Sequence, residues 1–225
     1  MSINCCLTLA SSHSAIEYSL AGSSTRVATG EPPANFLYLA YPILNVPSED
    51  FKVGSFAYYT ALHEIGHALG LSHTHQDEGG SYLGKELSNK DDTIRNSVMS
   101  YSVSDRNTVL IEKDGKLEAQ KIYSSTPMRY DIQAMEALYG RSTTSNIGDT
   151  VYQWADRIQT LETIYDSDGV DTLDASNQTE EVHIDLQPGS FQSIGIWSQE
   201  EQVQHYVDKG YGDKQTIELF IELSA

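Results

Sequence analysis

Three histidines and a glutamate lie close together between residues 63 and 73, in a stretch that reads HEIGHALGLSH. Residues four apart share one face of a helix, so His63 and His67 can direct both imidazoles at a single ion. Glu64 is one residue along, where its carboxylate can act as a general base toward a water held on that ion. The spacing therefore predicts a helix that carries two metal ligands and a catalytic carboxylate.

The third expected ligand lies beyond the end of this helix. Gly70 permits the left-handed backbone conformation that ends a helix, so the chain can turn there and bring His73 back toward the metal. Three neutral imidazoles leave one coordination position open, which is typical of catalytic zinc. We expect zinc, although cobalt, nickel or copper can occupy the same ligand set in vitro.

The helix must also pack against the rest of the protein through the face opposite the two histidines. Four apolar residues recur at helical spacing on the face away from His63 and His67, namely Tyr58, Leu62, Ile65 and Leu69. We therefore expect a buried helix whose polar face carries the metal site.

A second motif, SVMSY at residues 97–101, follows the histidine stretch. With the extended zinc motif it makes the chain similar to the metzincin metalloproteinases, in which a methionine turn follows the zinc-binding helix. The turn resembles that of the serralysin branch. This resemblance implies that Met99 underlies the zinc and that Tyr101 approaches the metal, where its phenol would stabilise the oxyanion of the tetrahedral intermediate.

The resemblance extends into both flanks of these motifs. Downstream it includes Pro127, Asp131 and Ile132, the LYG at residues 138–140 and the GDTVY at residues 148–152, which match the end of a serralysin catalytic domain and the start of its C-terminal β domain. Upstream, residues 25–30 and 36–41 look like strands that approach the zinc helix. It covers roughly residue 25 onward, and we place no match for residues 1–24.

The chain also departs from the serralysin pattern. Thr74 stands where serralysins commonly have proline, and His75 adds a fourth imidazole, which we interpret as a solvated loop residue. Residues 42–55 leave little room for an edge strand that would pair with an extended peptide substrate. The nonapeptide repeats of the family are missing, so we expect a truncated or minimal member.

An acidic segment, DSDGVD at residues 166–171, is a second candidate metal site. Carboxylates grouped around a glycine suit a hard cation with several oxygen ligands. The serralysin resemblance implies calcium, bound by this segment together with residues at the start of the second domain: Asp166, Asp168 and Asp171 with Asn146, Gly148 and Thr150. The alternative is a solvated acidic turn.

Turn and periodicity signals divide the rest of the chain. The Asp114-Gly115 pair predicts a two-residue β-hairpin turn. A helix is expected from Pro127 to Gly140, with Ile132, Met135 and Leu138 toward the core. Short strands are expected in the segments DTVYQW, TLETIYD, EVHIDLQ and TIELFIEL. A boundary in the Ser/Thr-rich stretch after Gly140 gives a catalytic domain at 1–140 and a β-rich domain at 141–225.

Composition narrows the classes of partner. The chain has 225 residues, 39% of them hydrophobic, which is enough for a substantial core. Its net charge of −18 argues against nucleic acid and anionic membranes as partners, and it has no apolar run that could span a bilayer. The adjacent Cys5 and Cys6 suggest no disulfide framework. Extracellular secretion is implied by the resemblance alone.

We predict an α+β protein with a metzincin catalytic domain followed by a short β-rich domain, acting as a zinc endopeptidase on polypeptide substrates. The resemblance also implies a proteinaceous inhibitor as a possible kind of partner. One alternative is a catalytically impaired fragment that binds zinc and calcium, and another is a calcium-dependent adhesion module. The presence of Glu64 favours an enzyme, because metal binding alone does not require that carboxylate.

Overall fold

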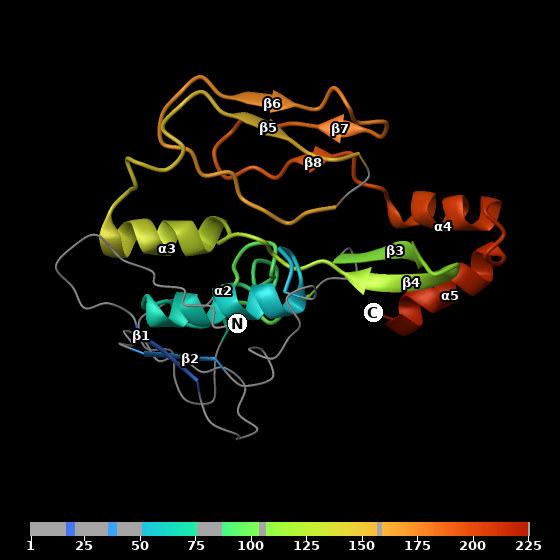
Figure 1. Cartoon of the computed structure of the whole chain (residues 1–225), viewed down its shortest axis with the longest axis horizontal. Helices are drawn as coiled ribbons and strands as arrows, with labels where there is room; N and C mark the ends of the chain where they lie inside the picture. The colour runs from blue at the N-terminus through green and yellow to red at the C-terminus, as the bar shows by residue number, and fades with distance from the viewer. Residues whose placement is uncertain are drawn as a thin grey trace. The chain divides into compact units, whose positions relative to one another are not determined.

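The structure is a computed structural model that describes residues 51–75, 87–103, 107–156 and 159–224, together with two short N-terminal strands (Figure 1). These strands, β1 (Glu17–Leu20) and β2 (Phe36–Leu39), pair in parallel. The strand expected at residues 25–30 lies outside the described residues. β2 falls within the segment expected at residues 36–41.

The chain forms two compact units. The first comprises Met1–Ser102 and Ser124–Tyr139, and the second comprises Val103–Tyr123 and Gly140–Ala225. The hairpin segment that we assigned to residues 1–140 thus groups with the second unit. The division into domains at residue 140 stays a prediction.

Two helices frame the described part of the first unit. α2 (Phe56–Ala68) begins at Ser55, whose hydroxyl accepts a hydrogen bond from the Tyr58 N–H, and the chain turns after it at Gly70, where φ is +101°. α3 (Arg129–Tyr139) ends before Gly140, where φ is +83°. Both helix ends therefore use glycine in the left-handed region, as the sequence predicted.

The burial of α2 differs from our expectation. Its buried residues include Tyr59, His63, Glu64 and His67, whereas the apolar set at 58, 62, 65 and 69 is half-buried. The metal-ligand side is more buried because it packs against residues 97–100, all of which are buried. In α3, Leu138 is 52% exposed, so our expectation that it faces the core is wrong.

In the second unit, β3 (Thr108–Lys113) and β4 (Lys116–Lys121) form the expected antiparallel hairpin. Lys113 pairs with Lys116, and the two turn residues, Asp114 and Gly115, have φ of +52° and +73°. Positive φ at both central residues is the type I′ geometry, whose twist matches that of the strands. The predicted turn is confirmed.

Helices α4 (Gln199–Asp208) and α5 (Lys214–Ser224) contact this hairpin and complete a small core, in which the buried residues are Leu110, Val203, Tyr206, Ile217 and Ile221. The strand predicted for TIELFIEL is wrong, because this segment lies in α5. Ile217 and Ile221 are one helical turn apart and both are buried, and the Asp213 carboxylate accepts a hydrogen bond from the Thr216 N–H at the helix start.

The remaining strands are short. β5 (Val151–Gln153) pairs in parallel with β6 (Thr172–Asp174), and β7 (Val182–His183) pairs antiparallel with β8 (Ser193–Ile194). Residues 160–166, expected as a strand, contain a single bridge residue at 161. Helices and small sheets together confirm the α+β class. The helices of the described residues all fall short of the length and apolar character that a membrane crossing requires.

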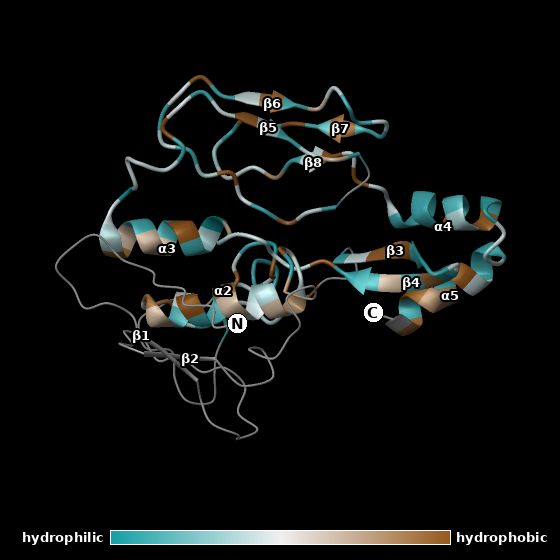
Figure 2. Ribbon diagram, viewed as in Figure 1, coloured by the Kyte–Doolittle hydropathy of each residue, from teal (hydrophilic) through white to brown (hydrophobic). Residues whose placement is uncertain are grey.

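The hairpin is anchored to α4 through the outer edge of β3. The Leu110 N–H donates to the Gln202 Oε1 at 2.8 Å, and the Tyr206 hydroxyl donates to the Leu110 carbonyl at 3.1 Å. Figure 2 shows α4 as largely hydrophilic, yet Gln202 is only 4% exposed. One side chain of a mostly polar helix therefore satisfies a buried strand amide.

We predict that Gln202→Ala lowers the free energy of unfolding by about 1–3 kcal/mol, because it leaves the buried Leu110 N–H without its acceptor. Denaturant titration of both variants measures the change. The matched control is Gln204→Ala on the same helix, since the Gln204 side chain is exposed. Equal losses in the two variants would show that the buried hydrogen bond contributes nothing specific.

Candidate metal centre

Helix α2 presents His63 and His67 from successive turns, and backbone carbonyls hold one nitrogen of each ring. The Nδ1 of His63 lies 2.7 Å from the Val98 carbonyl oxygen, and the Nδ1 of His67 lies 2.9 Å from the Leu71 carbonyl oxygen. A carbonyl can only accept, so each Nδ1 carries the proton and donates it. The Nε2 of each neutral ring therefore keeps its lone pair for a metal.

His73 brings a third imidazole to the same point. Its Nε2 lies 3.1 Å from the Nε2 of His63 and 3.0 Å from that of His67. Nitrogens bound to tetrahedral zinc at its usual bond length stand roughly 3.3 Å apart. A single proton on His73 can serve one of its two neighbours, whereas a cation attracts all three lone pairs. The three histidines therefore fit a zinc ion.

Burial favours the metal-binding form of His63. The residue is 4% exposed, and this burial lowers the pKa of His63 to about 4, with the neighbouring His67 and His73 adding to the shift. The imidazole is thus neutral at ordinary pH, which is the form that ligates a metal.

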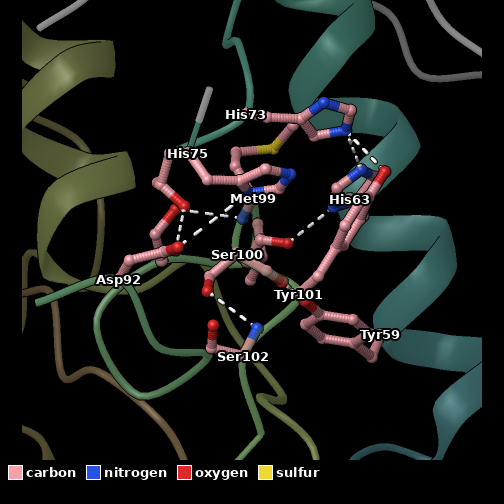
Figure 3. Close-up of polar contacts among 12 residues, drawn as sticks. Tyr59, His63, His73, His75, Asp92, Met99, Ser100, Tyr101 and Ser102 are labelled. Carbon is pink, nitrogen blue, oxygen red and sulfur yellow. Dashed lines mark hydrogen bonds and ion pairs between the residues drawn. The ribbon is translucent and has the colours of Figure 1, made fainter. Parts of the chain in front are cut away.

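The methionine turn lies under the site and packs tightly against α2 (Figure 3). Met99 is 1% exposed, and a Cβ built on Gly66 would stand 2.5 Å from the Met99 Sδ. The Tyr59 hydroxyl also donates to the Ser100 carbonyl. A glycine inside a helix costs stability, and here it leaves room for the buried Met99 thioether to approach α2 closely.

Tyr101 lies at the exposed edge of the centre. Its hydroxyl is 2.6 Å from the His73 Nε2, its ring lies against that of His63 at 5.3 Å, and the residue is 60% exposed. Glu64, by contrast, is 4% exposed, on the helix that carries the ligands. The structure thus places an exposed phenol beside the imidazoles of His63 and His73, and Glu64 is a buried residue of the helix that carries His63 and His67.

His75 is a loop residue that is half-buried beside the third imidazole. Its ring stacks on that of His73 with centroids 5.2 Å apart, and its Nδ1 lies 4.0 Å from the Asp92 carboxylate (Figure 3). The Thr74 hydroxyl donates to the same carboxylate at 2.5 Å. Asp92 therefore tethers the two residues that follow the third ligand.

The acidic segment of the second unit does not form a comparable cluster. Among the described residues, the one group of His, Cys, Asp or Glu whose ligand atoms converge within 4.8 Å is His63, His67 and His73. Asp171 accepts from the Thr150 N–H at 3.0 Å, and Asp166 accepts from the Tyr152 hydroxyl at 2.6 Å.

The other residues that we assigned to calcium lie close to the acidic turn. The Gly148 carbonyl oxygen would stand 2.6 Å from a Cβ on Gly169, so it lies against the acidic turn. Asp168 accepts from the Gly169 N–H at 3.0 Å, and the Asn146 side-chain amide donates to the Tyr165 carbonyl at 3.2 Å. The carboxylates thus accept hydrogen bonds both from their own turn and from residues 150 and 152.

Three supports of the zinc site were missing from our sequence interpretation: Gly66 and the carbonyls of Leu71 and Val98. A glycine in a helix interior is a sequence signal of close packing, because it lowers helix stability and usually has a packing reason. The two carbonyls have no signal, since every residue carries one.

Known proteins match both the site and its surroundings. A family model described as Met-zincin matches residues 48–188. Serralysin of Photorhabdus luminescens is 33% identical over 164 residues, which cover 66% of this chain and 32% of that protein. Serralysin of Proteus mirabilis is 31% identical over 160 residues, covering 64% and 30%. Metalloprotease AprA of Pseudomonas entomophila is 33% identical over 157 residues, covering 63% and 31%. The chain thus spans about a third of the length of these relatives.

We predict that the chain binds one zinc ion, and that replacing both His63 and His67 with alanine abolishes this binding, because His73 alone remains of the three converging imidazoles. Elemental analysis of the dialysed proteins measures the zinc content. His183→Ala is the control, since His183 is exposed and belongs to the second unit. Unchanged zinc in the double variant would contradict the assignment.

Proposed function

The chain belongs to the Met-zincin family as a serralysin-type metzincin, and on that premise we propose that it is a zinc-dependent endopeptidase. The observation that carries the proposal is the convergence of three imidazole Nε2 atoms at 3.0–3.1 Å on the helix that also holds Glu64. A site built only to store metal has no need of that carboxylate.

A zinc ion held by the three imidazoles would supply Lewis acidity for the substrate carbonyl and the attacking water. Glu64 accepts a proton from that water and passes it to the leaving amine. Its burial keeps the carboxylate in a medium of low dielectric, where its interactions with charge are strong. The Tyr101 hydroxyl donates a hydrogen bond to the oxygen that becomes negative in the transition state.

The substrate class that we propose is polypeptides, with a proteinaceous inhibitor as a further partner and an extracellular location. The names of the relatives, serralysin and metalloprotease, support this assignment. The competing proposal is a catalytically impaired metal-binding fragment. Incubation with casein, with and without a chelator, separates the two: cleavage that stops on chelation and returns with zinc supports the protease.

For the general base, we predict that Glu64→Gln retains zinc and lowers turnover by about 10²- to 10⁴-fold, because the amide keeps the shape and cannot take up the proton. The measurements are zinc content and initial rates on a peptide substrate. Glu222→Gln, on the exposed side of α5, controls for the loss of one charge. Wild-type turnover in Glu64→Gln would remove Glu64 from the mechanism.

For the phenol, Tyr101→Phe is expected to lower kcat by roughly 10- to 1000-fold with little change in KM, by analogy with other oxyanion donors. An interaction formed only in the transition state affects the chemical step. Steady-state kinetics measure both constants, with Tyr58→Phe as the control because Tyr58 lies on α2 outside the histidine cluster. A rise in KM alone would make Tyr101 a substrate-binding residue.

We also propose a calcium ion at the acidic turn, bound by Asp166, Asp168 and Asp171 with Gly148, Thr150 and Asn146. The Gly148 carbonyl against Gly169 supports an oxygen-rich site. Two of the carboxylates also accept backbone hydrogen bonds, Asp171 from Thr150 and Asp168 from Gly169. If calcium binds the folded state, a hundredfold excess over its dissociation constant stabilises the protein by about 2.7 kcal/mol. Melting curves of zinc-loaded protein in calcium and in a calcium-selective chelator test this. Coincident curves would identify a solvated turn.

A further inference from the structure

The Asp131 carboxylate joins the methionine turn to the start of α3. The residue lies in the first turn of that helix and is 2% exposed. Its Oδ1 accepts a hydrogen bond from the Ser97 hydroxyl at 2.5 Å, and its Oδ2 accepts from the backbone N–H groups of Val98 at 2.8 Å and Met128 at 2.7 Å. The Ser97 oxygen in turn accepts from the Met99 N–H at 3.0 Å. One buried side chain therefore fixes three consecutive residues of the turn.

Val98 connects this carboxylate to the first metal ligand. Its N–H donates to Asp131, and its carbonyl oxygen accepts from the His63 Nδ1 at 2.7 Å. Val98 is 2% exposed, so both of its polar groups are removed from solvent and depend on these two partners. The ring of His63 can turn only as far as this carbonyl allows.

We propose that Asp131 is a positioning residue for the metal centre, which acts through Val98 to set the orientation and the tautomer of His63. The proposal rests on the proposed function in taking His63 as a zinc ligand, and it adds a residue that contacts neither the metal nor the substrate. Groups that orient a ligand from behind commonly change metal affinity by about 10- to 100-fold when they are replaced.

The charge of Asp131 distinguishes this role from simple packing. Burial raises the pKa of Asp131, and the hydrogen bonds from Ser97, Val98 and Met128 oppose that rise. Hydrogen bonds to an ionised acceptor are shorter and stronger than neutral ones. A carboxylate also has acceptor positions alone, whereas an asparagine amide must turn its NH₂ toward either the Ser97 hydroxyl or the two backbone N–H groups.

The test uses Asp131→Asn in the full chain, with Ser124→Ala as the matched control. Ser124 is fully buried in the same unit and donates to the Ile94 carbonyl, and it has no hydrogen bond to Val98. Two quantities are measured for each variant: the zinc dissociation constant, by competition with a chromophoric chelator, and the free energy of unfolding of the metal-free protein. The free energy of unfolding reports any loss of fold stability, and the zinc dissociation constant reports the effect on the metal ligands.

We expect Asp131→Asn to weaken zinc binding by about 10- to 100-fold, and Ser124→Ala to leave it near the wild-type value even where its metal-free stability falls. Equal zinc affinity in both variants would overturn the proposal and leave Asp131 with a structural role. If Asp131→Asn does not fold, Ser97→Ala replaces it, because it removes the hydroxyl that fixes the Asp131 carboxylate behind Val98. Its zinc affinity must then fall below that of Ser124→Ala.

This experiment is independent of the assay for peptidase activity. Weaker zinc binding by Asp131→Asn in a protein that never cleaves casein would refute the protease and retain the positioning role. Cleavage of casein by a wild-type protein whose Asp131→Asn variant binds zinc normally would do the reverse.

Discussion

Two hydrogen bonds from histidine Nδ1 atoms to backbone carbonyls set the chemistry on which the rest of the site depends. With Val98 and Leu71 accepting those protons, the Nε2 atoms of His63 and His67 carry lone pairs that point at a common centre. Each carbonyl must be delivered by a segment outside α2. The turn at Gly70 places the Leu71 carbonyl, and the methionine turn places the Val98 carbonyl. The helix ending and the turn are therefore both requirements of one ligand arrangement.

The ligands were readable from sequence because their geometry is local. His63 and His67 need only the helical repeat, and His73 needs one left-handed residue, which Gly70 provides with φ of +101°. The supports were not readable because they are long-range. The bond between His63 and Val98 joins residues 35 apart, and the acceptor is a carbonyl whose side chain carries no information about it. Helical spacing predicted that these histidines converge, and the packing that orients them depends on tertiary structure.

In the second unit, too, long-range packing limited what the sequence could predict about secondary structure. TIELFIEL suggests a strand by its β-branched and aromatic residues, yet its burial follows the helical repeat between Ile217 and Ile221. Our sequence analysis also missed α4, which begins with a capping box formed by Ser198 and Glu201. The prediction of the hairpin turn at Asp114 and Gly115 was correct because this turn type needs positive φ at both positions, and an Asp-Gly pair favours that conformation locally. Local backbone constraints were therefore predictable where packing preferences were not.

The candidate metal centre is buried on one side and exposed on the other. His63, Glu64 and His67 are each less than a tenth exposed, whereas Tyr101 is 60% exposed. Burial keeps His63 neutral, at a cost that the carbonyl bond to its Nδ1 offsets. The same low dielectric strengthens any interaction between Glu64 and a developing positive charge. Among the described residues of the centre, Tyr101 therefore marks the exposed side, where its hydroxyl lies 2.6 Å from the His73 Nε2.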